Sequence, residues 1–561
     1  MKIAIASNIN VDFLGEYMER YLSNHGIEAE IYLSGFNQIA QEVLDPNSSA
    51  KRFDPDYFLI FLDIEEYLWE LLLDKALTDH LKEEAMKKVE ELIEIFEKAS
   101  DEFKYILVNN VFIRPIGTAL LEYNTGYSLK ELEMEINRKL LEIARRRRNI
   151  YIVDYKSMIE EWGWKNLYDS KLFYLGSIRF NKKGFEELAK LYGRYIRSIS
   201  GKIKKVLVLD ADGVLWGGII GEDGISGIKL DVQKEGRIYR DFQRVVAGLN
   251  QKGIVLALNS KNNEEDVKEV FKNHQGMVLK EEDFAVMKIN WRDKVTNMME
   301  ISKELNLGLD SFVFIDDSEF ERGFIKRELP QVVVPDFPED VSKLLEFIDE
   351  IEREYFPKVK LTEEDKKRGQ MYKAQVKREE LRKRVKTLDD FLRSLKMRMY
   401  VGLVDNNTIG RVAQLTQRTN QFNMTTRRYT EEDIRRMEEE GYKIYWMRLE
   451  DKFGDNGIVG VIIIGYEGNK ARIDTFLMSC RVIGRKAEDA FIWYVEEEMM
   501  KEGIEEIEAE YIPTKKNTLV KEKYEELGYK LVEEKEGGKY YRKKLPEEHL
   551  NKPKWIEIKG V

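Results

Sequence analysis

The chain has 561 residues, a formal net charge of −11 and a single cysteine. The acidic balance argues against a nucleic-acid-binding protein, and one thiol excludes intrachain disulfide bonds and multi-cysteine zinc sites. The hydrophobic share of 43% predicts packed cores, and the length predicts about three to four domains. No apolar run reaches the roughly 18 residues of a membrane span, and the first residues are typical of a strand rather than a signal peptide, so we expect a cytoplasmic protein without a membrane partner.

The first 200 residues predict an α/β domain. Short apolar runs, typical of strands, alternate with longer helical patterns, and the runs cover residues 2–6, 29–32, 57–62, 105–109 and 150–154. This alternation favours a parallel sheet covered by helices. Polar pairs follow the first and fourth runs, Ser7-Asn8 and Asn109-Asn110.

The central region, residues 201–355, carries paired carboxylates at the end of an apolar run. Val206–Leu209 is typical of a strand buried on both faces, and it leads directly into Asp210-Ala211-Asp212-Gly213. Ligands bind outside the carboxyl ends of parallel strands. One carboxylate can attack phosphorus there while its i+2 neighbour handles the leaving-group proton, and the glycine permits the bend between them. From this stretch alone, an ordinary strand followed by an Asp-Gly turn remains the alternative.

Three later stretches place further polar side chains at the ends of predicted elements. The apolar run 253–258 ends at Asn259-Ser260, Lys294 opens a helical pattern, and the run 312–315 ends at Asp316-Asp317. This order of carboxylates, serine, lysine and carboxylates resembles the four motifs of the haloacid dehalogenase-like (HAD) phosphohydrolases. The stretches 215–224, 259–263 and 314–322 more narrowly resemble the FkbH-like branch, which is known for placing a three-carbon glyceryl unit on an acyl carrier protein.

The HAD resemblance implies a catalytic role for four of these residues. Asp210 would be the nucleophile that forms an aspartyl-phosphate, and Asp212 the general acid and then the base for water. Ser260 and Lys294 would hold the phosphoryl oxygens, with the lysine offsetting charge during transfer. Two further residues are assigned to substrate binding, Gly213 and Asn259.

The same resemblance implies a metal site. Asp316 and Asp317 would complete an all-oxygen ligand set with Asp210 and the backbone carbonyl of Asp212. Oxygen ligands beside a phosphate favour Mg²⁺. The motif leaves open whether Asp316 or Asp317 touches the metal, and we favour Asp316 directly. The glycine-rich residues 217–227 predict a small flap instead of a folded cap, so the site should admit a substrate on a long arm or a macromolecule.

The N-terminal region resembles the SGNH hydrolase-like domain that begins many FkbH-like proteins. In that fold a serine after the first strand, here Ser7, is the nucleophile and requires an aspartate and a histidine. The corresponding stretch, residues 172–180, contains no histidine. Without a general base the serine is not activated, so we predict a catalytically degenerate scaffold or docking domain.

Residues 356–395 predict a charged helical connector that faces solvent, because apolar residues are sparse there. A basic patch that docks an acidic carrier protein is the alternative. Residues 396–561 combine several predicted strands with helical patterns and resemble the GNAT acyltransferase fold. The predicted strands cover residues 397–403, 443–450, 457–466, 470–476, 505–511 and 529–531, and the helices 408–419, 430–440, 484–502 and 515–527.

In the GNAT family a turn after a strand cradles the pyrophosphate of coenzyme A with backbone amides at a helix N-terminus. The matching turn here runs from Arg481 through Gly484 to Lys486. Lys486 stands where the family pattern has a small residue. An ordinary strand-to-helix turn is the alternative. Cys480 precedes this turn and, as the single cysteine, is the one possible site of an enzyme-bound thioester. Basic neighbours and a helix N-terminus would lower its pKa and favour the reactive thiolate. A buried structural cysteine is the alternative.

We therefore predict a multidomain α/β enzyme: an SGNH- or flavodoxin-like domain (1–200), a Rossmann-like HAD core with minimal cap (201–355), the connector (356–395) and a GNAT-like α+β domain (396–561). The FkbH resemblance implies an Mg²⁺-dependent reaction that dephosphorylates a phosphoglyceryl group from 1,3-bisphosphoglycerate and loads glyceryl as a thioester on a phosphopantetheinylated acyl carrier protein. One alternative is a stand-alone Mg²⁺-dependent phosphatase with a GNAT-like recognition module. The other is a non-catalytic protein that binds a carrier or acts in assembly.

Overall fold

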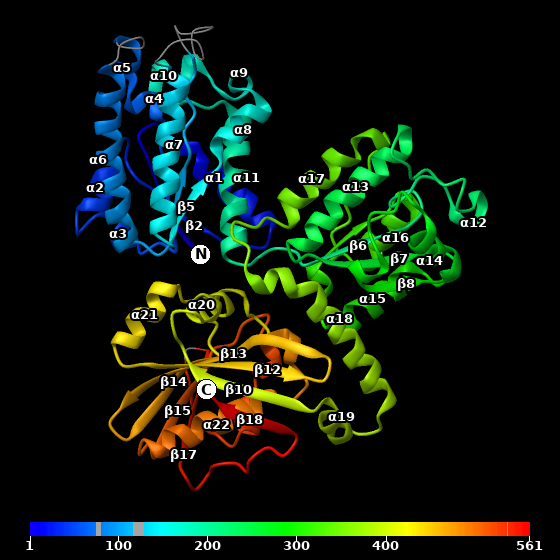
Figure 1. Cartoon of the computed structure of the whole chain (residues 1–561). Coiled ribbons are helices and arrows are strands. Elements are labelled where there is room, and N and C mark those ends of the chain that lie inside the picture. The colour runs from blue at the N-terminus through cyan, green and yellow to red at the C-terminus, as the bar shows by residue number, and fades with distance from the viewer. Residues whose placement is uncertain (75–79, 116–127, 536) are drawn as a thin grey trace. The chain divides into compact units, whose positions relative to one another are not determined.

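The computed structural model describes residues 1–74, 80–115, 128–535 and 537–561. The chain divides into two compact units, Met1–Ile199 and Ser200–Val561 (Figure 1). The described residues form one parallel sheet in the first unit, and one parallel and one mixed sheet in the second. This arrangement confirms the predicted multidomain α/β fold class. The predicted boundaries at residues 355 and 395 lie inside the second unit and stay predictions.

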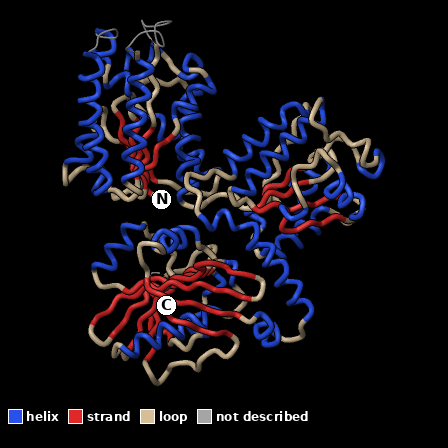
Figure 2. Tube along the Cα trace, viewed as in Figure 1, coloured by secondary structure: helices blue, strands red, loops and turns tan. Residues whose placement is uncertain are grey.

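The first unit contains a five-stranded parallel sheet in the order β2-β1-β3-β4-β5. This is the flavodoxin-like order, in which ligands bind at the carboxyl ends of the strands. Figure 2 shows the strands of this sheet, in red, among blue helices. Each predicted strand is present to within a residue or two. The strands are β1 (Lys2–Ser7), β2 (Glu30–Leu33), β3 (Tyr57–Phe61), β4 (Ile106–Asn109) and β5 (Ile150–Val153).

Helices cover both faces of this sheet because β1 is apolar on both. Ala4 and Ala6 face a core shared with α6 and α7, whereas Ile3 and Ile5 are buried on the opposite face. The longer helices are α1 (Asp12–Asn24), α6 (His80–Glu102), α7 (Leu129–Arg146), α8 (Tyr155–Trp162) and α11 (Lys182–Ile199). The shorter ones are α2 (Ile39–Leu44), α3 (Ser49–Phe53), α4 (Ile64–Tyr67), α5 (Trp69–Asp74), α9 (Trp164–Leu167) and α10 (Ser170–Gly176).

The second unit begins with a four-stranded parallel sheet in the order β8-β7-β6-β9. Its strands are β6 (Val206–Leu209), β7 (Val255–Ser260), β8 (Phe284–Ile289) and β9 (Phe312–Ile315). Its helices are α12 (Ile220–Asp223), α13 (Lys234–Gln251), α14 (Glu264–Asn273), α15 (Lys294–Leu305), α16 (Glu319–Glu328) and α17 (Leu344–Tyr355). β8 is not among the predicted strands, because this half-buried edge strand follows four charged residues and contains Lys288. The small insert predicted after β6 is present, as α12 and a bridge between Gly217 and Lys229.

The mixed sheet has the order β16-β17-β15-β14-β13-β12-β10-β18, and the short strand β11 pairs with β14. Its strands are β10 (Met397–Leu403), β11 (Phe422–Asn423), β12 (Lys443–Asp451), β13 (Gly454–Glu467), β14 (Lys470–Met478), β15 (Glu506–Tyr511), β16 (Lys530–Lys535), β17 (Gly538–Lys544) and β18 (Ile556–Gly560). Its helices are α20 (Ile409–Arg418), α21 (Glu431–Glu439), α22 (Ala487–Lys501) and α23 (Lys523–Glu526). The prediction of one helix over 515–527 is wrong, because the segment contains only the 3-10 turn Thr518–Val520 and the four-residue α23. The buried Asn517 amide precedes both and donates to the carbonyls of Asn423 and Ile512.

The predicted solvated connector is a packed element. It forms α18 (Glu363–Arg384) and α19 (Leu388–Leu395). Arg378 on α18 is buried and donates from Nε and Nη2 to the Asp451 carboxylate at 2.6 and 2.8 Å. Tyr372 on α18 packs into the core beneath the parallel sheet, and Phe391 on α19 packs into the core of the mixed sheet. The prediction that this segment faces solvent is therefore wrong, because part of its charge is neutralised inside the protein.

Candidate active site at the end of the central sheet

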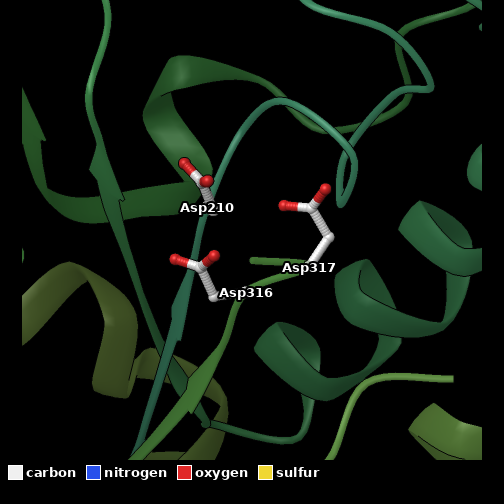
Figure 3. A group of neighbouring side chains, drawn as sticks. All are labelled: Asp210, Asp316 and Asp317. Atoms are coloured by element: carbon white, nitrogen blue, oxygen red, sulfur yellow. The ribbon is translucent and has the colours of Figure 1, made fainter. Parts of the chain in front are cut away.

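Two neighbouring strands of the central sheet bring three carboxylates together. β6 and β9 are parallel, with Leu209 in register with Ile315, so Asp210 and Asp316 follow paired strand ends. The carboxylates of Asp210, Asp316 and Asp317 each offer an oxygen within 4.8 Å of the others, and their side chains lie side by side (Figure 3). The sequence predicted these three residues as metal ligands. The structure places them as one cluster where a parallel sheet binds its ligands.

Lys294 is the cation that faces this cluster. It is the first residue of α15, whose N-cap Asp293 accepts a hydrogen bond from the Thr296 amide. Its Nζ lies 2.7 Å from Asp210 Oδ2 and 2.5 Å from Asp316 Oδ2. Burial alone would lower the pKa of Lys294, but the charges of Asp210 and Asp316 outweigh burial and raise it. The lysine is therefore held charged between the two carboxylates.

Asp316 is completely buried, and its surroundings combine groups that oppose its negative charge with groups that stabilise it. Burial, followed by the neighbouring charge of Asp210, raises the pKa of Asp316 to about 6, and Lys294 opposes both effects. The Ser318 amide donates to its Oδ1 at 2.9 Å. Arg322 donates to the backbone carbonyls of Asp316 and Asp317, which fixes the strand end that carries both carboxylates. Arg322 is not among the site residues predicted from the sequence, although it lies in the stretch 314–322 that resembles the FkbH-like branch.

The Asp212 side chain lies outside the group of three carboxylates. Its Oδ1 accepts hydrogen bonds from Trp216 Nε1 at 2.8 Å and from the Ile220 amide at 3.1 Å. Its Oδ2 accepts one from Asn262 Nδ2 at 2.9 Å. The carboxylate is thus held by groups on the insert after β6 and on the loop after β7. The predicted metal contact was through the backbone carbonyl of Asp212, and it stays a prediction.

Gly213 meets two requirements at once. Its φ of +69° lies in the left-handed region that side-chain-bearing residues rarely adopt. A Cβ at this position would fall 2.2 Å from Asp317 Oδ2. The glycine therefore allows the chain to turn after Asp212 and leaves the space that the Asp317 carboxylate occupies. A direct substrate contact for Gly213 stays a prediction.

The end of β7 supplies the predicted serine and asparagine. Ser260 is the last residue of the strand, and its Oγ accepts a hydrogen bond from Asn262 Nδ2 at 3.1 Å. Asn259 is fully buried, donates to the Lys294 carbonyl at 2.9 Å and accepts from Asn297 Nδ2 at 3.1 Å. The Asn259 side chain is thus bonded to the start of α15, where it positions Lys294. A substrate contact of Asn259 stays a prediction.

Cys480 lies away from the carboxylate cluster. Its carbonyl accepts a hydrogen bond at 2.8 Å from Asn306, the C-cap of α15, whereas Lys294 begins the same helix. Burial, followed by the neighbouring Cys480, raises the pKa of Tyr372 on α18, so the thiol lies next to that helix. The structure therefore does not bring Cys480 together with Asp210.

The turn after Cys480 lies against α18. Arg481 is buried, and its guanidinium contacts Met371 of α18 and donates to Ser479 Oγ. Arg485 donates to Gln375 of α18 at 2.7 Å and also contacts Asp451. Gly484 adopts a φ of +83°. The predicted ligand-binding roles of Arg481 and Gly484 stay predictions.

In the first unit, the residues at the corresponding strand ends hold one another. Ser7 is buried, and its Oγ accepts a hydrogen bond from the Ile9 amide. Arg179, in the stretch where a hydrolase would carry its histidine, forms an ion pair with Asp63 at 2.6 Å. The catalytic state of this unit stays a prediction.

The four-stranded parallel sheet and the three carboxylates at its end agree with the HAD-like domain that the sequence resemblance implies. Residues 2–182, which lie in the first unit, match the family model described as the FkbH N-terminal domain. The chain is similar to the crystal structure of the N-terminal part of the protein BF1531 from Bacteroides fragilis, described as containing a phosphatase domain complexed with Mg. The identity is 27%, the match covers 64% of this chain and 95% of that one, and the TM-score is 0.59.

Acetyltransferases are also among the similar structures. The ribosomal-protein-S18-alanine N-acetyltransferase of Escherichia coli is 13% identical, with 26% of this chain and 94% of that chain covered and a TM-score of 0.22. Ard1 from Thermoplasma volcanium is 14% identical, with coverage of 26% and 97% and a TM-score of 0.21. Such low values support no functional conclusion. No protein of curated function matches the chain.

Among the described helices, none combines the length and apolarity needed to cross a membrane.

Proposed function

We propose that the second unit is a phosphatase-type enzyme that transfers a phosphoryl group to Asp210. The observation that carries this proposal is Lys294, whose ammonium group bridges Asp210 and Asp316 at the ends of two paired strands. A buried cation between carboxylates can offset the charge that develops on a transferring phosphoryl group. The phosphatase domain named for the similar structure from Bacteroides fragilis supports the same class of reaction.

The residues of the site divide the work of such a transfer. Asp210 is fixed by an Ala211 amide that donates to its Oδ1 at 2.7 Å, and this orients the carboxylate for attack on phosphorus. Lys294 and the Ser260 hydroxyl hold phosphoryl oxygens. Asp212 gives a proton to the leaving oxygen and later takes one from the water that hydrolyses the phospho-aspartate.

The carboxylate cluster fits a magnesium ion. The three carboxylates offer oxygen ligands alone, which are the donors that Mg²⁺ prefers. The residues that would hold it are Asp210, Asp316 and Asp317. Mg²⁺ was bound to the phosphatase domain of the similar crystal structure. When bound, the ion would neutralise charge on the phosphoryl oxygens.

We further propose that the substrate is a phosphorylated three-carbon acyl donor, 1,3-bisphosphoglycerate, and that the glyceryl group becomes a thioester on a phosphopantetheinylated acyl carrier protein. The sequence resemblance to the FkbH-like branch implies this reaction, and residues 2–182 match the FkbH N-terminal domain model. The small insert between β6 and α13 also supports it, because an uncapped site admits a substrate attached to a macromolecule.

Intact-protein mass spectrometry tests both levels of the proposal. The wild type, Asp210→Asn and the exposed control Asp336→Asn are each incubated with Mg²⁺, a regenerated supply of 1,3-bisphosphoglycerate and the carrier. We expect a glyceryl-sized mass gain on the carrier with the wild type and the control, and none with Asp210→Asn. Phosphate release without a gain on the carrier would overturn the loading reaction, and no phosphate release at all would overturn the phosphatase.

A stand-alone phosphatase is the second candidate function. The observation that favours it is the position of Cys480 beside Asn306, at the opposite end of α15 from Lys294. In that case the mixed-sheet domain would recognise the substrate or a partner and would take no part in the chemistry. Phosphate release that is equally fast with and without the carrier protein would favour this function.

A further inference from the structure

The hydrogen bonds at Asp212 leave one position open for a proton. A carboxylate offers about four lone-pair sites, two on each oxygen. Both sites of Oδ1 are used, by Trp216 Nε1 and by the Ile220 amide. Among the residues that the structure describes, Oδ2 accepts one hydrogen bond, from Asn262 Nδ2. The remaining lone pair of Oδ2 is therefore the place where Asp212 can carry a proton.

Asn262 determines which way this lone pair points. Its amide group is buried and lies between two residues of the site, with Nδ2 at 2.9 Å from Asp212 Oδ2 and at 3.1 Å from Ser260 Oγ. The amide nitrogen has two hydrogens, so it can serve both oxygens. The reverse amide orientation would set a carbonyl oxygen against the carboxylate, which is repulsive. Asn262 therefore links the Asp212 carboxylate, the proposed proton carrier, to the Ser260 hydroxyl, which is proposed to hold a phosphoryl oxygen.

We propose that Asn262 is a positioning residue that aims the open lone pair of Asp212 Oδ2 at the leaving oxygen and so determines which leaving groups the enzyme accepts. The inference rests on the proposed phosphatase function and deepens it. Asn262 acts through Asp212, and it neither attacks the substrate nor exchanges a proton.

The proposed proton path balances over two steps. In the first, the bond between phosphorus and the leaving oxygen breaks, a bond from phosphorus to Asp210 forms, and the Oδ2 proton moves to the leaving oxygen. In the second, water attacks phosphorus, its proton moves to Oδ2, and Asp210 is released. A strongly basic leaving group needs the first proton transfer, whereas a carboxylate leaving group departs without it.

A series of leaving groups tests this role. The probes are phenyl phosphate, 4-nitrophenyl phosphate and acetyl phosphate, whose leaving groups are progressively weaker bases. kcat/KM is measured with Mg²⁺, because it reports the steps up to the first irreversible one. We expect Asn262→Ala to lower kcat/KM for phenyl phosphate roughly tenfold more than for acetyl phosphate, which is part of the roughly 10²–10⁴-fold that general acid catalysis typically contributes.

Two further variants separate positioning from folding. Asn262→Asp keeps the shape but sets a carboxylate beside Asp212, so it should show the same selective loss. Asn263→Ala changes the adjacent exposed asparagine, which contacts Trp291 and Asp266 instead, and should leave all three rates unchanged. In an Asp212→Asn background, Asn262→Ala should have no further effect on the leaving-group dependence.

Each outcome decides the inference. An equal loss on all three substrates would mean that Asn262 is merely structural and would overturn it. Hydrolysis of acetyl phosphate alone by the wild type would show that Oδ2 delivers no proton to the leaving group, which overturns this inference and leaves the phosphatase intact. No phosphate release from any probe would overturn the proposed function itself.

Discussion

Asn306 donates a hydrogen bond from its side-chain amide to the backbone carbonyl of Cys480, across 174 positions of sequence. Asn306 follows the last residue of α15, and Lys294, which contacts the carboxylates of Asp210 and Asp316, begins the helix. The 12 residues of this helix span roughly 18 Å at 1.5 Å per residue. The one thiol and the carboxylate cluster are therefore fixed to opposite ends of one rigid element.

This separation predicts that phosphate release does not depend on the thiol. Cys480→Ala should release phosphate from an acyl phosphate as fast as the wild type, because the change lies a helix length away from Asp210. Phosphate is measured colorimetrically with Mg²⁺ present, and Asp210→Asn serves as the inactive reference. A large loss of phosphate release with Cys480→Ala would contradict the separation of the two sites. If glyceryl passes through Cys480, the same variant should still abolish loading of the carrier.

Removal of Lys294 should cost both activity and stability. Lys294→Met keeps the bulk of the side chain but leaves the buried carboxylates of Asp210 and Asp316 without their cation. Breaking a buried ion pair in this way costs about 3–5 kcal/mol. We expect a lower Tm that Mg²⁺ raises more in the variant than in the wild type, since the ion can replace the lost charge. Differential scanning fluorimetry with and without Mg²⁺ measures the Tm and its change on Mg²⁺ binding, and phosphate release measures the loss of activity.

The control for this prediction is Lys303→Met in the last turn of the same helix, where the side chain is exposed. It should cost less than about 1 kcal/mol and show the wild-type response to Mg²⁺. Equal Tm shifts for the two variants, or a Lys294→Met variant that ignores Mg²⁺, would argue against a metal at the carboxylates.

A methyl group at residue 213 should disturb the metal site directly. Gly213→Ala places a Cβ 2.2 Å from Asp317 Oδ2 and forces alanine into a left-handed conformation that costs about 1–2 kcal/mol. Displacement of one carboxylate should weaken Mg²⁺ binding on the order of tenfold to a hundredfold, measured by calorimetric titration. Gly221→Ala is the matched control, because nothing lies within 4 Å of its added Cβ. Unchanged Mg²⁺ affinity in Gly213→Ala would exclude Asp317 from the site.

The sequence predicts where the candidate site residues lie when the signal is local. Asp210 and Asp316 each follow four consecutive buried apolar residues, so a strand, its end and its carboxylate are visible in one short stretch. Lys294 follows its own N-cap, Asp293, so the start of its helix is marked as well. Parallel pairing then brings these ends together without any further information.

Contacts between distant segments are not predictable in this way. Asn262 meets Asp212 across 50 positions, and only the placement of the two loops shows that they touch. β18 pairs with β10, although most of the mixed-sheet domain lies between these two strands in the sequence. Asn259 lies next to Ser260 along the strand and was assigned to the substrate, yet the alternation of side chains sends its amide to Lys294.

The connector shows the same limit, and it yields a last prediction. Its sequence lacks an apolar stripe, so nothing local indicates that α18 packs against a sheet. The helix is held instead by the buried pair of Arg378 with Asp451, 73 positions away.

Arg378→Met should destabilise the second unit by about 3 kcal/mol, the lower end of the range for a broken buried pair, because Arg485 still contacts Asp451. Arg384→Met, an exposed position on the same helix, should change stability by no more than about 0.5 kcal/mol. Urea denaturation followed by tryptophan fluorescence compares the two, and equal midpoints would mean that α18 is the solvated connector that its composition suggests.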